Sequence, residues 1–381
     1  MRRVYLDHNA TCPLREVARR ALEQALAAPL GNPSSAHADG RRARALLEAA
    51  RERLAAAVGA ARDEVVFTSG GTESNALALA AAAGPVLVSP IEHPSVLRAA
   101  ERRGARRLAV DGWGRVDPGA PLRELAGDGA SLVSVALANH ETGVVQDIAA
   151  LARAVHEFGG LLHCDASQAL GKWPLSFRDL DADLLTLSAH KLGGPVGVGA
   201  LLVRKGTRVT PLLLGGEQEG GLRAGTEPAA LAAAFAAAAE EAVARRAEDA
   251  VRWRGWRAAL RDGLRALEPD LVVNSPEDAV LPNTLNVSFP GRPGAALVQR
   301  LDLEGVSASH GSACASGARR PSPVLLAMGA DEARAAGALR FSLGPCNVDG
   351  DVELALARLA VALRDVARRG TSTSVHGTLP A

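Results

Sequence analysis

A single lysine, Lys191, interrupts two apolar runs in the stretch LSAHKLGGPVGVG, residues 187–199. Lysine side chains usually lie on solvated surfaces, so a lysine at the end of a strand-like apolar run is a candidate for chemistry. An amine held at the edge of a buried sheet loses solvation, and this lowers its pKa and makes it a nucleophile or a base. The same lysine could also be a strand-end side chain that reaches for solvent, so its neighbours decide the interpretation.

Polar groups also follow the other apolar runs. EVVF ends in TSGGTESN, where two glycines and Thr72 open a helical pattern whose backbone N–H groups suit an anion. His93 follows PVLVSP, the motif NHETG follows SLVSVALA, and Asp165 and Gln168 follow GLLH. Taken singly, the glycines and threonine could be only a turn and a cap, His93 a capping residue, and Asp165 a core carboxylate.

The elements that must position these groups alternate between strand and helix from about residue 60 to 205. Apolar runs of strand length begin near residues 64, 85, 105, 131, 160, 183 and 199, and helical patterns separate several of them. This alternation predicts an α/β fold, with a large domain whose mostly parallel sheet lies between helices on both faces. Ligands of such sheets bind beyond the carboxyl ends of the strands, so we expect the polar groups to meet at one edge.

Beyond residue 225 the pattern changes. It predicts two long helical stretches within residues 227–267, three short strands and a last helix within residues 349–370, which together indicate a smaller α/β C-terminal domain. The expected division is an N-terminal segment that joins the small domain, a large domain, the small domain and a disordered tail. These comprise residues 1–14, 15–248, 249–370 and 371–381.

Composition excludes several classes of protein. Lys and Arg number 43 against 42 for Asp and Glu, so the chain lacks the charge expected for direct binding to nucleic acid or an anionic membrane. We expect no signal peptide and no membrane span, because the most apolar windows are too short. The four cysteines are widely spaced without a CxxC pair, so we expect no metal site and a reducing, cytoplasmic setting.

One cofactor would use all of these groups together: a phosphate-binding turn, an aromatic ring, a carboxylate and a lysine. Pyridoxal 5'-phosphate requires a lysine for its covalent link, a carboxylate that keeps its ring nitrogen protonated, and an anchor for its phosphate. The sequence therefore predicts a pyridoxal phosphate site at the edge of the sheet, with Lys191 as the attachment point.

Ten motifs in order then give the chain a close resemblance to the cysteine desulfurases, which are class V, fold-type I pyridoxal phosphate enzymes. The resemblance runs from about residue 5 to 365, and the segment SASHGSACASG is similar to that of the housekeeping and nitrogenase-type group. The resemblance starts at YLDHNATCP, and the ten motifs are GNPSSAH, FTSGGTESN, EHPSV, NHETGVVQDI, HCDASQALGK, SAHKLGGPVGVGAL, RAGT, PNTLNVSF, GSACASG and RFSLG.

The resemblance implies a role for each cofactor contact. Lys191 would carry the cofactor as an internal aldimine, Asp165 would pair with the ring nitrogen, and Gln168 would bond the ring oxygen. His93 would stack on the ring and relay protons. The remaining contacts would hold the phosphate: Gly71, Thr72, Ser188 and His190 of the same chain, and Thr226 from the other subunit of a homodimer.

The resemblance also implies a substrate and a reaction. Arg340, assisted by Asn32, would bind the carboxylate of L-cysteine, since a guanidinium binds a carboxylate bidentately. Cys314 would take the substrate sulfur as a persulfide, leaving L-alanine, and pass it to a sulfur-acceptor protein. Cys314 lies among small residues without hydrophobic periodicity, which indicates a mobile loop more than a buried thiol. The acceptor stays open: iron–sulfur assembly, tRNA thiolation, DNA sulfur modification and thio-metabolite synthesis all fit.

Other functions share parts of this pattern. A selenocysteine lyase or another class V enzyme would use the same cofactor residues without needing Cys314 on a flexible loop. A paralogue that only docks in a sulfur-transfer assembly would not need Lys191, Asp165, Arg340 and Cys314 together.

The chain departs from the family pattern at three places. His140 replaces an asparagine that contacts the ring oxygen, so either His140 or Asn139 makes that contact here. An imidazole can titrate near physiological pH, and its cation would shift the protonation of the bound cofactor. Cys12 stands where threonine is usual, and Arg319 with Arg320 replaces an apolar–acidic pair, which bears on acceptor docking.

Overall fold

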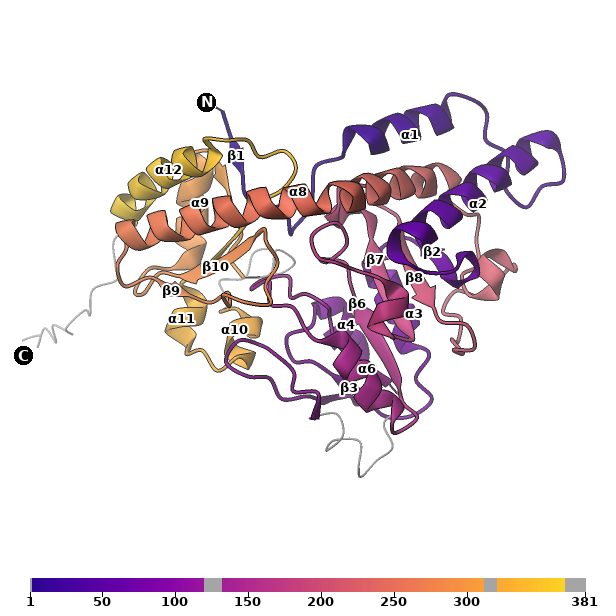
Figure 1. Ribbon diagram of the computed structural model, residues 1–381, viewed down its shortest axis with the longest axis horizontal. Coiled ribbons are helices and arrows are strands. Elements are labelled where there is room, and N and C mark those ends of the chain that lie inside the picture. Colours follow the sequence, from indigo (N-terminus) through magenta and orange to yellow (C-terminus); the bar gives the residue numbers. More distant parts are fainter. Residues whose placement is uncertain (1, 120–131, 312–320, 367–381) are drawn as a thin grey trace, which may run out of the picture.

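The computed structural model describes residues 2–119, 132–311 and 321–366. Within these ranges the largest sheet has seven strands in the order β2-β8-β7-β6-β5-β3-β4 (Figure 1). β8 is antiparallel to both neighbours, and all other neighbouring pairs are parallel. The mostly parallel α/β sheet predicted from the sequence is confirmed. Its strands are β2 (Val65–Thr68), β3 (Val86–Val88), β4 (Arg106–Arg107), β5 (Leu132–Ser134), β6 (Leu161–Asp165), β7 (Leu184–Ser188) and β8 (Gly199–Val203).

Helices cover both faces of this sheet because its strands are apolar on both sides. Along β7, Leu184 packs into one core cluster, whereas Leu185 and Leu187 pack into the other. The first cluster includes residues of α3 (Gly71–Leu79) and α4 (Pro94–Glu101). The second includes residues of α2 (Ala38–Val58), α6 (Ile148–His156) and α8 (Ala229–Leu267).

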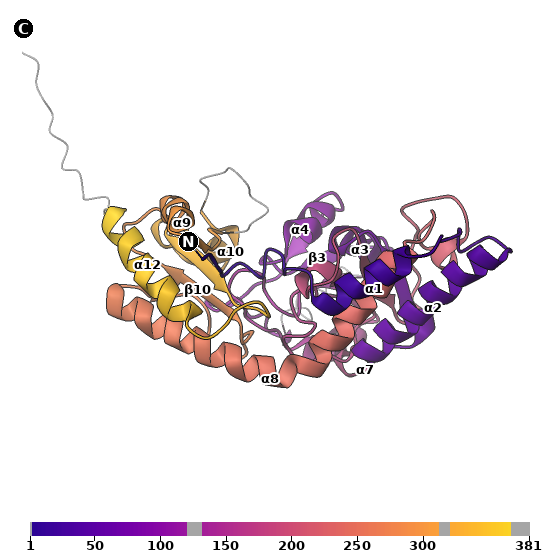
Figure 2. The ribbon, with the colours of Figure 1, turned by 90° about the horizontal axis from the view of Figure 1, so that it is seen from above.

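The prediction of two long helical stretches within residues 227–267 is wrong, because this part of the chain forms one helix, α8, of 39 residues. Its first half is rich in buried alanine and packs on the sheet, and its second half packs on the smaller part of the molecule, as Figures 1 and 2 show. The only glycines after its start, Gly255 and Gly263, cost a helix about 1 kcal/mol each relative to alanine, which the packing of both halves outweighs. The expected domain boundary at residues 248–249 therefore falls inside a continuous helix, and the division itself stays a prediction.

The smaller part is built on a three-stranded antiparallel sheet in the order β12-β10-β9. Its core gathers Trp253 of α8 with apolar side chains of this sheet and of the C-terminal helix. β1 pairs in parallel with β11, so the N-terminus lies against this part. The elements are β1 (Val4–Tyr5), β9 (Val272–Val273), β10 (Thr284–Ser288), α9 (Gly294–Leu303), β11 (Val306–Ser307), α10 (Pro323–Ala327), α11 (Glu332–Ala336), β12 (Ala338–Ser342) and α12 (Asp351–Asp365).

Short helical elements complete the described chain. None of the helices in the described residues is both long enough and apolar enough to cross a membrane. The predicted tail 371–381, Cys314, Arg319 and Arg320 lie outside the described residues. The remaining elements are α1 (Glu16–Leu26), η1 (Arg62–Glu64), α7 (Phe177–Leu180), η2 (Ala189–Lys191) and η3 (Gln218–Gly221).

Candidate active site

A cavity of about 200 Å³ lies where the parallel strands end, and it collects ten of the residues predicted from the sequence. A larger open hollow of about 860 Å³ between α2 and η3 contains none of them. The cavity wall is formed by several elements and by the turns that follow the strands, as expected for the carboxyl edge of an α/β sheet. The ten residues are Gly71, Thr72, His93, His140, Asp165, Gln168, Ser188, His190, Lys191 and Arg340.

Lys191 reaches the cavity from η2, which directly follows β7. Its Nζ donates to the backbone carbonyls of Asn9 and Ala10, at 2.8 Å each. The N-terminal segment lies there because Asn9 N–H donates to Ser342 Oγ and Cys12 N–H donates to His190 O, at 2.9 Å each. The segment thus connects β12 to the end of β7 and holds the amine of Lys191.

The first turn of α3 has the features of an anion cradle. Its N-cap, Gly70, has no side chain to occupy the N-terminal N–H groups. A Cβ added at Gly71 would lie 3.2 Å from Ser167 Oγ and 3.4 Å from Ser188 Cβ, so a side chain there would crowd the cradle. Burial lowers the pKa of His190 to about 4, with help from Lys191 and Lys172, so this ring is neutral and carries one N–H.

The buried carboxylate of Asp165, the last residue of β6, also lines the cavity. Its Oδ1 accepts from Ser167 N–H at 2.9 Å, and its Oδ2 accepts from Asn75 Nδ2 at 2.8 Å. Both hydrogen-bond partners are neutral, so neither of them pairs with the carboxylate as a cation would. An acid and a lysine that line one cavity match two groups that a pyridoxal ring requires.

His93 caps α4 and is held in one tautomer. Its Nδ1 accepts the backbone N–H of Ser95 at 3.1 Å, so the proton of the neutral ring is on Nε2. Ser95 Oγ lies 2.7 Å from the same nitrogen and accepts from Asn75 Nδ2, which also donates to Asp165. Burial lowers the pKa of His93, and Lys191 lowers it further against the opposing effect of Asp165.

The side chains of His140 and Asn139 have different surroundings in the structure. The side chain of Asn139 is buried and bonded to backbone: Nδ2 donates to Ile91 O, and Oδ1 accepts from the N–H groups of Glu141 and Thr142. His140 lines the cavity, with its ring edge-to-face to that of His93 at a centroid distance of 5.4 Å. Burial, His93, Arg340 and Lys191 lower the pKa of His140 well below its usual value. This direction argues against a cationic His140 near neutral pH.

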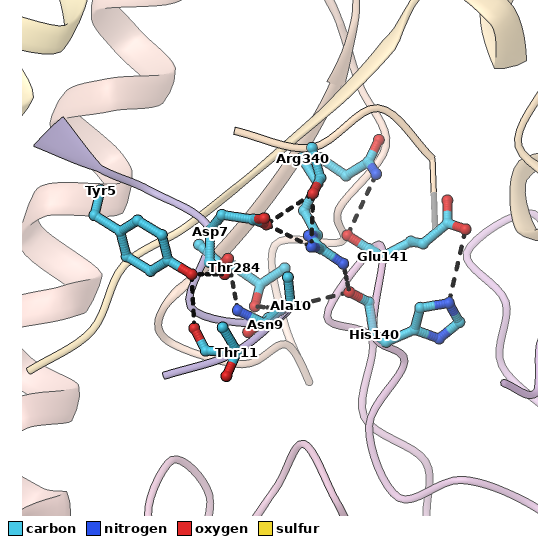
Figure 3. Close-up of polar contacts among 12 residues, drawn as sticks. Tyr5, Asp7, Asn9, Ala10, Thr11, His140, Glu141, Thr284 and Arg340 are labelled. Carbon is cyan, nitrogen blue, oxygen red and sulfur yellow. Dashed lines mark hydrogen bonds and ion pairs between the residues drawn. The ribbon is translucent and has the colours of Figure 1, made fainter. Parts of the chain in front are cut away.

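Arg340 is the buried cation of the cavity, with a relative exposure of 1%. Figure 3 shows its guanidinium between Asp7 and the carbonyl of His140. Nη2 bonds Asp7 Oδ1 at 2.6 Å and Ser309 Oγ at 3.1 Å, and Nη1 donates to His140 O at 2.9 Å. These contacts fix the planar group at the cavity wall, where it suits a carboxylate.

Two predicted residues lie outside the cavity. Asn32 is exposed, and its Oδ1 accepts the N–H of Ser34 at 2.9 Å in a local turn. Thr226 is exposed beyond η3. Sequence reasoning missed Asn9, Ala10, Asn75, Ser95 and Ser167, whose only signal was a place in polar segments next to the predicted ones.

Comparison with known proteins agrees with this geometry. The model of the family described as aminotransferase class-V matches residues 4–354. The cysteine desulfurase IscS of Dictyoglomus turgidum is 40% identical, with 93% of each chain covered. The IscS-like cysteine desulfurase of Mycobacterium tuberculosis is also 40% identical, with 92% of this chain and 94% of the relative covered.

Solved structures give the same result. The NifS-like protein from Rickettsia africae superposes with a TM-score of 0.89 at 31% identity, covering 96% of this chain and all of the other. DndA from Streptomyces lividans superposes with a TM-score of 0.74 at 36% identity, covering 86% and 96%. The chain therefore belongs to the aminotransferase class V family.

Proposed function

We propose that this chain is a pyridoxal phosphate-dependent cysteine desulfurase, which converts L-cysteine to L-alanine and transfers the sulfur to Cys314 as a persulfide. The observation that carries the proposal is the single cavity in which Lys191, Asp165, the α3 cradle and Arg340 meet. Relatives that cover nearly the whole chain are named cysteine desulfurase, which supports this activity over others in the family.

The residues present fit the cofactor. The crowded, side-chain-free position at Gly71 and the neutral donors Thr72, Ser188 and His190 would hold the phosphate. Asp165 would bind the ring nitrogen, and Gln168 with His140 would bond the ring oxygen. When bound, pyridoxal phosphate withdraws electrons from the substrate α-carbon and so makes its proton removable.

The chain's own groups then bind the substrate and move its protons. Arg340 binds the carboxylate of L-cysteine, which orients the Cα–H bond toward the amine of Lys191. That amine takes the Cα proton, and the Asn9 and Ala10 carbonyls that bind Nζ in the described structure are placed to stabilise its protonated form. His93, with its proton on Nε2, is a donor for the departing part of the substrate.

Sulfur transfer is assigned to Cys314. Its thiolate attacks the substrate sulfur, so a sulfur–sulfur bond forms and the carbon–sulfur bond breaks. The electron pair of the broken bond stays on the carbon fragment, which takes up protons and leaves as alanine. Ser309, which precedes Cys314 by five residues in the chain, supports this assignment, because it pairs with Arg340 through backbone hydrogen bonds of 3.1 and 2.8 Å.

We further propose a homodimer in which Thr226 reaches the partner's phosphate site. The segment before Thr226 exposes Leu212, Leu213 and Leu214 at 48%, 47% and 85%, and Val196 is 76% exposed. Such a set of large apolar side chains is better explained by a covering surface than by solvent. A second copy would cover them. A reducing, cytoplasmic setting suits the free thiols Cys12, Cys164 and Cys346.

The test uses purified protein reconstituted with pyridoxal phosphate and supplied with L-cysteine. We expect a visible absorption band that depends on Lys191 and the release of alanine and sulfide in equal amounts in the presence of a reductant. The Lys191→Ala variant should show neither the band nor the products. A wild-type protein that binds the cofactor but releases no alanine would contradict the activity.

A further inference from the structure

A second lysine, Lys172, lies buried beside the active site. It follows β6 on the turn that carries Gln168, four residues later in the chain. Gly171 makes this path possible, because its φ is +76° and an added Cβ would lie 2.5 Å from Ala242 of α8. The close approach of α8 leaves Lys172 with a relative exposure of only 7%.

The ammonium of Lys172 has neutral partners. Nζ donates to Gln168 Oε1 at 2.9 Å and to Asn9 Oδ1 at 3.2 Å. Among the described residues no carboxylate forms an ion pair with it. A buried charge without a counter-charge destabilises a folded protein, so a lysine bonded to Gln168 and Asn9, which both line the active-site cavity, calls for a functional explanation.

The first consequence concerns the amide of Gln168. In its protonated form the Lys172 amine only donates hydrogen bonds, so it fixes Oε1 of Gln168 on its own side. The other end, Nε2, donates to the carbonyl of Asn9 at 2.9 Å. A flipped amide would place Nε2 against the ammonium and Oε1 against a carbonyl, and both contacts would repel. The second N–H of Nε2 therefore stays available to an acceptor in the cavity that Gln168 lines.

The second consequence concerns charge. Lys172 Nζ bonds the side chain of Asn9, and Lys191 Nζ bonds the backbone carbonyl of the same residue. Like charges at such proximity each favour the neutral form of the other. The other charged or titratable groups that act on Lys172 or feel it are Cys12, Arg15 and His8 of the N-terminal segment, His190 of η2 and Arg340 of β12.

We propose that Lys172 is a positioning residue of this active site. In its protonated form it holds the amide nitrogen of Gln168 toward the ring oxygen of the bound cofactor, and its charge favours the unprotonated nitrogen of Lys191. This inference rests on the proposed function, because it assigns Lys172 a role toward the cofactor that Lys191 binds.

The test is a spectral pH titration of the reconstituted enzyme, in which the visible band of the Lys191-linked cofactor reports the protonation of that nitrogen. Lys172→Met removes donor and charge, Lys172→Gln keeps a donor without charge, and Lys172→Arg keeps both. The Met and Gln variants should raise the midpoint by about one pH unit, as expected for losing a nearby like charge. The Arg variant and the exposed-lysine control Lys205→Met should titrate as the wild type does.

A double-mutant cycle tests the contact with Gln168. If Lys172 acts through that amide, the double variant should lose less cofactor affinity than the product of the losses caused by Lys172→Met and Gln168→Ala alone. We expect the two values to differ by about fivefold or more. Circular dichroism confirms folding, and the Gln variant decides the midpoint if the Met variant does not fold. Unchanged midpoints with a normal wild-type band would overturn this inference alone. A wild type that gains no band would overturn the proposed function and this inference with it.

Discussion

Burial of the Lys172 ammonium predicts a specific pH dependence of stability in the cofactor-free protein. Burial lowers the pKa of Lys172 from 10.5 to about 7, with Lys191, Arg340 and Arg15 contributing against the opposing effect of Cys12. Between these values the unfolded chain binds a proton that the folded protein does not, so stability rises with pH across this window. The full difference corresponds to about 5 kcal/mol, since one pKa unit is worth about 1.4 kcal/mol.

The assay is urea unfolding of cofactor-free wild type and Lys172→Met at several pH values from 6 to 10. The difference between the two proteins cancels the other titrating groups. Near pH 6 we expect the free energy of unfolding of Lys172→Met to exceed that of the wild type by several kcal/mol. A difference in packing adds a contribution that does not depend on pH. The excess should shrink as pH rises toward 10. The control Lys205→Met should show no such trend. A difference that stays constant over the whole range would refute the claim that this ammonium is desolvated.

Three further predictions follow from other contacts. Glu219→Gln should lower the free energy of unfolding by about 3–5 kcal/mol in urea titrations, because it leaves the buried Arg51, now bonded bidentately at 2.7 and 2.9 Å, without its counter-charge; a loss below about 1 kcal/mol, typical of exposed pairs, would contradict this. His140→Asn should leave the spectral pH titration of the cofactor unchanged, because the buried imidazole is already neutral; a moved midpoint would show that His140 titrates. Leu214→Glu should convert dimers to monomers in sedimentation velocity and weaken cofactor binding, and an unchanged dimer would count against the proposed interface.

The sheet and the rim of the site were predictable because their signals are carried by side chains. Apolar runs such as 183–189 have the length and two-sided burial of central strands, and the polar residue after each run marks the strand end. Since parallel strands present their carboxyl ends at one edge, Asp165 and Lys191 could be placed together without a structure.

What the sequence did not predict depends on backbone groups and on packing between distant segments. The backbone carbonyls of Asn9 and Ala10 bind Lys191. Every residue has a backbone carbonyl, so the sequence does not show which of them binds a side chain. Lys172 lies in the stretch ALGKWPL, which reads as an exposed turn until α8 covers it. The continuity of α8 was not predicted because its apolar pattern changes along the helix. The first half is a run of buried alanines against the large sheet, whereas the buried apolar residues of the second half lie on the side that faces the smaller part of the molecule.

The measurement that tests the central claim most directly is the mass of the peptide that contains Cys314 after the reconstituted enzyme has reacted with L-cysteine and has been digested without reductant. The account predicts a gain of one sulfur atom on Cys314 in the wild type, with alanine released in the same amount. Lys191→Ala should show no gain, and Cys314→Ser should bind cofactor and L-cysteine yet release almost no alanine. Sulfur found on Cys12, Cys164 or Cys346 instead, or alanine formed by Cys314→Ser at the wild-type rate, would contradict the account.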